Sequence, residues 1–286
     1  NWLHDAHDHA STTAGDTLTV YTENEATSNI ASTTVDKGPF ISVTANSDIF
    51  TTDGQYVGFY AYLTSGLNRG KYYLIIDSAS TTDSFSLNVS STTGLNPGDA
   101  FTIVDRVYTR AGGNGTCGGS EILCITKDGS ATSPLIFNAS GTVIVDASAL
   151  DDGLELTTSA YVVLDGFDVQ NALDDGVSIE SDNTTDFNTF QNLELHHNGD
   201  DGIYIDHDTF NNNVIADSVI YNNSGGGIGR SGGNSIITGN AIFSNNGGGG
   251  IGFDRYAVIF NNTIFDNSSD GILAQASNGS FDAIIR

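Results

Sequence analysis

The sequence predicts an all-β protein in which a parallel β-helix, or solenoid, follows a small antiparallel β domain. Three observations lead to this fold class: a repeat of 21 to 26 residues, apolar side chains that alternate with period two, and Gly, Asn and Asp residues between the apolar runs. Each repeat is too short for a strand–helix–strand unit. Short strands separated by tight corners suit one coil of a solenoid.

The repeat is clearest where a Gly precedes an aliphatic residue, in DDGLEL, DDGVSI, DDGIYI, GGGIGR, GGGIGF and SDGILA. The glycines of these words are Gly153, Gly176, Gly202, Gly227, Gly250 and Gly271. A second column of polar residues recurs at nearly the same spacing, four or five residues before these glycines. Its amides are expected to bond to one another as a structural ladder, with left-handed backbone at the corners. The Asn residues of this expected ladder are Asn171, Asn222, Asn245 and Asn267.

The period-two pattern also predicts an apolar stripe on the outside of the coils. Phe243 and Phe265 are expected to face inward, so Val219, Ile242 and Ile264 are expected to face out. An exposed aliphatic stripe is usually covered by another element or subunit. The sequence therefore predicts an interface with copies of the same chain.

The segments SATSPLIFNASGTVIVDAS and YVVLDGFDV resemble the entry into a right-handed parallel β-helix of the pectate-lyase-like superfamily. That superfamily includes carbohydrate-binding and sugar-hydrolase repeat proteins and phage tailspikes. The resemblance covers about residues 107–286 and implies a right-handed solenoid there. It leaves function open, because this fold hosts lyases, hydrolases, epimerases, adhesins and structural fibres.

Residues 1–106 lack the repeat and are expected to form the antiparallel domain, as a cap or assembly module. They contain β-like runs such as DTLTVYT, YYLIIDS and DAFTIVD. The stretch from Gly54 to Asp105 resembles small β domains of phage and virus-like structural proteins. The predicted domains are therefore 1–106 and 107–286.

The charge of the chain excludes some partners. Nine Lys and Arg residues against 35 Asp and Glu residues give a net charge of -26, and only 6 of the acids are Glu. Such a charge argues against nucleic acid and anionic membranes, and no stretch is long and apolar enough for membrane insertion. The first residue is Asn and the chain has no Met, which indicates a processed chain or a fragment.

Other features fit an extracellular, cell-surface or virion-surface location. Cys117 and Cys124 are spaced too widely for a redox motif, which favours a small surface disulfide in a secreted protein. The chain is also compatible with glycosylation at eight sequons, a number close to chance for this composition. Their asparagines are Asn88, Asn114, Asn138, Asn183, Asn222, Asn261, Asn267 and Asn278.

Paired aspartates recur at one corner of three successive coils, and we name these six residues the acidic corner. They are Asp151, Asp152, Asp174, Asp175, Asp200 and Asp201. Like charges stacked about 5 Å apart repel, so a cation, salt or protonation should compensate. Oxygen-rich acidic columns suit Ca²⁺. The alternative is a solvated corner that tolerates the charge.

The corner after each Gly–aliphatic strand supplies candidate catalytic residues. They are Asp206, His207, Asp208, Arg230, Asp254 and Arg255. A glycosidase needs two carboxylates, and a lyase or epimerase needs a base with Arg or Ca²⁺ beside a uronate. The alternative is a solvated or ligand-binding face.

The N-terminal segment NWLHDAHDHA holds a further histidine cluster, with His4, His7 and His9 flanked by Asp residues. It is either a metal site or a flexible arm.

Together these features favour an extracellular or virion-surface β-helix with a structural or adhesive role. We expect it to assemble with copies of itself, as tailspikes and filaments do, and to contact glycans. One alternative is a lyase, epimerase or glycoside hydrolase acting on an acidic polysaccharide. A second is a calcium-dependent carbohydrate-binding module. No organic cofactor is expected.

Overall fold

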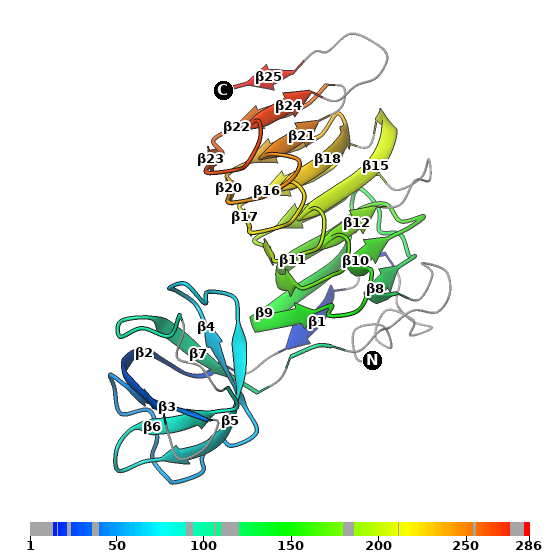
Figure 1. Ribbon diagram of the computed structural model, residues 1–286. Helices are drawn as coiled ribbons and strands as arrows, with labels where there is room; N and C mark the ends of the chain where they lie inside the picture. The colour runs from blue at the N-terminus through cyan, green and yellow to red at the C-terminus, as the bar shows by residue number, and fades with distance from the viewer. Residues whose placement is uncertain are drawn as a thin grey trace. The chain divides into compact units, whose positions relative to one another are not determined.

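A computed structural model describes residues 14–15, 17–21, 24–35, 40–89, 94–105, 107–109, 120–179, 186–210, 212–253, 256–274 and 283–286. The chain divides into two compact units, one of residues 22–107 and one of residues 1–21 with 108–286. The regular elements of the described residues are strands (Figure 1). These residues include no helix of the length and apolarity that a membrane crossing requires.

Residues 22–107 contain the predicted antiparallel β domain, which is a closed barrel. Its strands are β2 (Asn24–Val35), β3 (Ile41–Ala45), β4 (Tyr60–Leu63), β5 (Tyr72–Ala79), β6 (Ser84–Leu87) and β7 (Ala100–Val104). Their order around the barrel is β2-β3-β6-β5-β4-β7. Inward residues such as Ile41, Val43 and Phe101 are fully buried, because alternate side chains of each strand face the barrel interior.

The second unit is a parallel β-helix. One of its sheets runs β8 (Glu121–Ile125), β10 (Asp152–Leu156), β12 (Val177–Ile179), β15 (Ile203–Phe210), β18 (Ile228–Gly233), β21 (Ile251–Phe253) and β24 (Ile272–Ala274). The strand pairings in this unit are parallel, and these strands succeed one another along the solenoid in Figure 1.

The second sheet contains two further columns of strands. One column is β14 (Glu194–His196), β17 (Val219–Tyr221), β20 (Ala241–Phe243) and β23 (Thr263–Phe265). The other is β13 (Thr189–Gln191), β16 (Val214–Ala216), β19 (Ile236–Thr238), β22 (Val258–Phe260) and β25 (Ile284–Ile285). The long strands β9 (Leu135–Asp146) and β11 (Val162–Gln170) span both columns, and β11 bends at Gly166, whose φ is +82°.

The first strand, β1 (Thr17–Tyr21), pairs with β9 rather than with the barrel. The sequence placed this run in the N-terminal domain because it lacks the repeat. In the structure, its backbone hydrogen bonds extend the solenoid sheet, so the barrel contains none of these five residues.

The predicted outward stripe is wrong for two of its three residues. Ile242 is 0% exposed, and Ile264 packs against the core in the same register column as Ile220. Val219 belongs to the neighbouring, half-buried column. The error arose because strands such as Ala241–Phe243 are apolar at all three positions, so alternation alone cannot choose the inward one.

The outward positions of this sheet carry a different feature, a stacked aromatic column. Its members are His196, Tyr221, Phe243 and Phe265, with ring centroids 4.8, 5.2 and 4.9 Å apart in that order. Phe265, at the C-terminal end of the column, is 46% exposed. Offset stacking adds to the hydrophobic gain of each contact.

The amide ladder exists, but it contains only two of the four predicted residues. Asn245 and Asn267 are members, and the earlier members are Asn198 and Asn223. In each step a backbone N–H donates to the Oδ1 of the next coil at about 3.0 to 3.1 Å.

The other two predicted ladder residues occupy the corner position just before it. Asn171 and Asn222 adopt left-handed backbone, with φ of 62° and 55°. This conformation suits Asn because its short polar side chain tolerates it. The sequence columns were therefore offset by one residue in the earlier coils.

Five sequons have a described asparagine. Asn88, Asn222 and Asn261 are exposed, and Asn138 is half-buried. Asn267 instead uses its amide to donate to the carbonyl of Ile242, as part of the ladder. Asn114, Asn183 and Asn278 lie outside the described residues.

Candidate functional site

The acidic corner is brought together as the repeat predicts. Backbone N–H groups of Asp174 and Asp200 each donate to the carbonyl one coil earlier, those of Asp151 and Asp174, at 2.8 Å. Asp151, Asp174 and Asp200 therefore form an exposed column. Burial raises the pKa of Asp174, and the charges of Asp200 and Asp151 raise it further.

A second aspartate column lies beneath the first and is buried. Asp152, Asp175 and Asp201 are 7%, 5% and 7% exposed. The Oδ1 of Asp152 accepts the N–H of Asp175 at 3.0 Å, and that of Asp175 accepts the N–H of Asp201 at 2.9 Å. Asp201 in turn accepts the N–H of Gly226. These carboxylates thus act as a ladder at a different corner from the Asn ladder.

Burial makes the carboxyl groups of Asp175 and Asp201 difficult to ionise. It raises the pKa of Asp175 to about 8, with a further contribution from the charge of Asp201. It raises the pKa of Asp201 to about 7, and the charges of Asp200 and Asp174 add to the effect, although the Gly226 N–H opposes it. Burial therefore favours the protonated forms of Asp175 and Asp201.

The spacing of the carboxylates suits a cation. Oxygens of Asp152, Asp174 and Asp175 lie within 4.8 Å of one another, and so do those of Asp175, Asp200 and Asp201. Both groups consist only of oxygen ligands, which hard cations such as Ca²⁺ prefer. The chemistry of this corner is therefore compatible with calcium.

Three glycines of the following coil make room for Asp201. A Cβ on Gly229 would lie 1.5 Å from the Oδ2 of Asp201, and one on Gly225 would lie 2.5 Å from its Oδ1. A Cβ on Gly226 would also approach this carboxylate, at 3.2 Å. The GGGIGR word therefore has a local explanation, because side chains at these positions would displace the carboxylate.

A pocket of about 480 Å³ opens beside this carboxylate, and its lining includes residues of β15 and β18. Its lining combines two carboxylates, a phenol, a guanidinium group and a glycine-rich floor. The lining residues are Asp200, Asp201, Tyr204, Ser224, Gly225, Gly229, Arg230, Gly247 and Gly248.

Two predicted catalytic residues meet at the edge of this pocket. Arg230 Nη1 lies 2.7 Å from Asp206 Oδ1, and both side chains are partly exposed. Burial raises the pKa of Tyr204, and the negative charge of Asp206 raises it further, so the phenol stays protonated at neutral pH. Tyr204 was not among the predicted residues. It could have been found from its place in the DDGIYI word, at the outward position between Ile203 and Ile205.

Several predicted positions cannot be placed. Asp254, Arg255, His4, His7 and His9, and the side chains of His207 and Asp208, lie outside the described residues. Cys124 is buried and disulfide-bonded, and Cys117, its predicted partner, also lies outside them.

Comparison with known families identifies the solenoid. Residues 152–285 match the family described as the right handed beta helix region. The match covers less than half of the chain, and it agrees with the parallel solenoid described above. A search of curated proteins found no match.

Three solved structures are similar to this chain at low TM-scores. Pectate lyase Pel9A is 21% identical, with a TM-score of 0.43, over 56% of this chain and 43% of that one. An alginate lyase from Paenibacillus sp. str. FPU-7 is 22% identical, with a TM-score of 0.42, over 59% and 63%. The Gp54 tailspike of Acinetobacter baumannii bacteriophage AP22, solved with A. baumannii capsular saccharide, is 10% identical, with a TM-score of 0.28, over 96% and 54%. The chain spans less than two thirds of the length of each protein.

Proposed function

We propose that this β-helix is a calcium-dependent binding protein for an acidic polysaccharide, located outside the cell or on a virion surface. The observation that carries the proposal is the pocket that places Arg230 and Tyr204 beside Asp200 and Asp201. A guanidinium group recognises a carboxylate, and a tyrosine ring offers a flat face to a sugar. The glycine floor lets a bulky chain approach the backbone closely.

Bound calcium would offset the electrostatic repulsion between this acidic chain and an acidic polysaccharide. An acidic glycan should be repelled by a chain of net charge -26, and by the acidic corner most strongly. A Ca²⁺ ion held by Asp175, Asp200 and Asp201 would neutralise the corner and leave coordination sites for a uronate. Binding should therefore require both calcium and Arg230.

Affinity electrophoresis in gels containing polygalacturonate or alginate tests the proposal. Calcium should retard the wild-type chain, and a chelator should abolish the retardation. Arg230→Gln should reduce retention at least about tenfold, the usual scale for a lost charged contact. Arg286→Gln makes the same charge change at an exposed residue that directly follows β25. Its retention in the gel should equal that of the wild type. Equal retention of both variants, or none by the wild type, would count against the proposal.

A second candidate is a lyase or another polysaccharide-cleaving enzyme at the same pocket. It is favoured by Asp201, because a carboxylate with a pKa of about 7 in a pocket with Arg230 suits a general base. Lyase activity would produce the ultraviolet absorbance of an unsaturated uronate, and hydrolysis would produce new reducing ends. Activity that survives in both Asp201→Asn and Asp206→Asn would exclude this pocket as the catalytic site.

We also propose self-association, with the aromatic column in place of the discarded aliphatic stripe. Phe265 exposes nearly half of its surface at the end of that column. Light scattering should give a mass above 30.0 kDa that falls in Phe265→Ser. If the wild type is a monomer, self-association is refuted, and the proposed polysaccharide binding is unaffected.

A further inference from the structure

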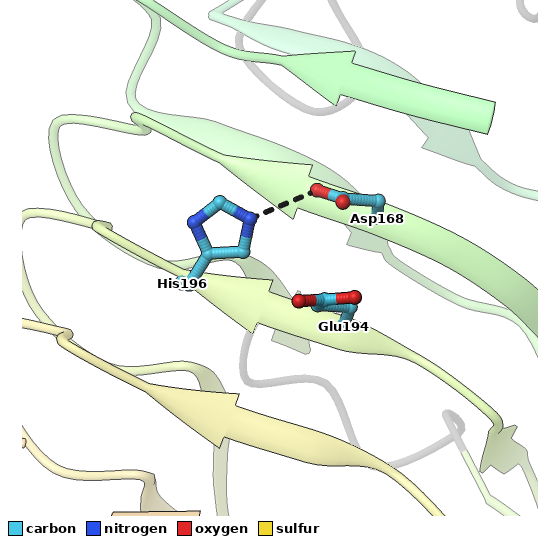
Figure 2. A group of neighbouring side chains, drawn as sticks. All are labelled: Asp168, Glu194 and His196. Carbon is cyan, nitrogen blue, oxygen red and sulfur yellow. Dashed lines mark hydrogen bonds and ion pairs between the residues drawn. The ribbon is translucent and has the colours of Figure 1, made fainter. Parts of the chain in front are cut away.

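A second group of ligand-type side chains lies on the other sheet, outside the acidic corner. Figure 2 shows the imidazole of His196 and the carboxylates of Asp168 and Glu194 converging on one small space. Asp168 comes from β11, and the other two come from β14 on the next coil, where Asp168 and Glu194 are register partners. His196 is 0% exposed and Asp168 is also buried. One ligand atom from each residue lies within 4.8 Å of the others.

The distances suit a small transition-metal ion. His196 Nε2 lies 3.1 Å from Asp168 Oδ1. Two ligands of a tetrahedral zinc ion, each about 2.0 to 2.2 Å from the metal, lie about 3.3 Å apart. A metal could therefore replace the proton shared by this pair with little movement of either side chain. An imidazole ligand also favours such a metal over Ca²⁺.

The neighbouring residues hold these groups in place. The Nδ1 of His196 lies 2.7 Å from Nδ1 of His197, which fixes the orientation of the buried ring. Tyr221 donates its hydroxyl proton to Glu194 Oε1 at 2.9 Å and stacks on His196. Outer hydrogen bonds to the second imidazole nitrogen and to a ligating carboxylate are typical of metal sites.

An independent observation comes from a buried amide on the neighbouring strand. Gln170 is the register partner of His196 and is 2% exposed. Its Nε2 has no hydrogen-bond acceptor among the described residues, although its Oε1 accepts from Asn171. A buried amide donor without an acceptor is unfavourable. A water or anion bound to a metal at His196 would supply that acceptor.

We propose that Asp168, Glu194 and His196 bind one divalent transition-metal ion of the Zn²⁺ class, with its fourth position filled by a water molecule. The ion would join two successive coils. The site is separate from the acidic corner and does not depend on the proposed polysaccharide binding.

Zinc titration of the full chain tests this site. The background carries His4→Ala, His7→Ala and His9→Ala, so that the N-terminal histidines cannot compete for metal. After removal of metal with a chelator, calorimetry should show one Zn²⁺ per chain, and Co²⁺ should give the visible absorption of a tetrahedral site. His196→Gln should weaken Zn²⁺ binding by at least about tenfold. This variant should fold, because Gln170 already occupies the same column one coil earlier.

Matched variants separate this site from other zinc binding. Asp168→Asn should weaken binding, whereas Asp165→Asn, on the same strand, should not. Glu194→Gln provides a second test at a half-buried ligand if His196→Gln fails to fold, as judged by circular dichroism. The proposal is overturned if the metal-free background chain takes up no Zn²⁺. It is also overturned if Asp201→Asn, rather than the ligand variants, removes the binding.

Discussion

Replacing Asp201 with Asn removes one buried negative charge and keeps an oxygen that can accept the N–H of Gly226. The Asn ladder shows that an amide can do this, because Asn223 Oδ1 accepts the N–H of Asn198 at 3.1 Å. We therefore expect Asp201→Asn to stabilise the chain when calcium is absent and the pH is above neutral.

The magnitude follows from the pKa of Asp201, which is about 7 in the folded chain against 3.8 for an ordinary Asp. A raised pKa means that the folded state binds the proton more tightly than the unfolded state. Stability is therefore greatest below about pH 4 and decreases as the pH rises from about 4 to about 7. Three pH units at about 1.4 kcal/mol each give a loss of about 4 kcal/mol at pH 8. Asp201→Asn should recover about 2 to 4 kcal/mol of it.

Urea unfolding in chelator at pH 4 and pH 8 measures this difference. The gain of Asp201→Asn should shrink to under about 1 kcal/mol at pH 4, where the carboxyl is protonated in the folded chain. Asp266→Asn is the control, because it makes the same charge change at an exposed corner with φ of 54°. Added calcium should reduce the advantage of Asp201→Asn, since the wild type gains binding energy of about 2.7 kcal/mol at one hundred times the dissociation constant. A gain independent of pH would refute the reasoning.

Three further substitutions test the corners and the aromatic column. Asn223→Ala should lower the free energy of unfolding in urea by about 3 to 5 kcal/mol, because it leaves buried ladder groups unpaired. The control is Asn246→Ala, at the exposed residue that follows ladder residue Asn245, and it should cost under about 1 kcal/mol. Gly229→Ala should lower the thermal midpoint, because the new Cβ displaces the Asp201 carboxylate. Adding Asp201→Ala should restore the midpoint. If the midpoint stays low in the double variant, the clash between residue 229 and Asp201 is not the cause. Phe243→Ala should cost about 2 kcal/mol and Phe243→Tyr almost nothing, so equal losses would argue against stacking.

Much of the fold could be predicted because Gly–aliphatic words recur where strands of one sheet begin. Gly153, Gly176 and Gly202 also placed the preceding Asp pairs at one corner, which the structure confirms. The ladder was harder to place, since Asn suits both a left-handed corner and an amide stack. Asn222 and Asn223 are adjacent in the sequence, and Asn222 adopts the left-handed corner conformation while Asn223 belongs to the amide ladder.

The candidate site was only partly predictable. Asp206 and Arg230 were both expected on one face, but their ion pair depends on rotamers that the repeat does not encode. The contact between Asp168 and His196 joins residues 28 positions apart through their outward side chains. No local pattern marks such a pair, because each residue alone resembles an ordinary polar surface position.

The ladder from Asn198 to Asn267 and the buried aspartate ladder run in opposite directions along the solenoid. At the Asn corner a coil offers its N–H to the oxygen of the following coil, and at the acidic corner it offers its oxygen to the N–H of the following coil. If the Asn corner of one coil lay over the Asp corner of the preceding coil, two acceptor oxygens would face each other. The reverse misplacement would set N–H against N–H. An Asn corner and an Asp corner therefore cannot exchange places between successive coils without leaving buried hydrogen-bonding groups unpaired.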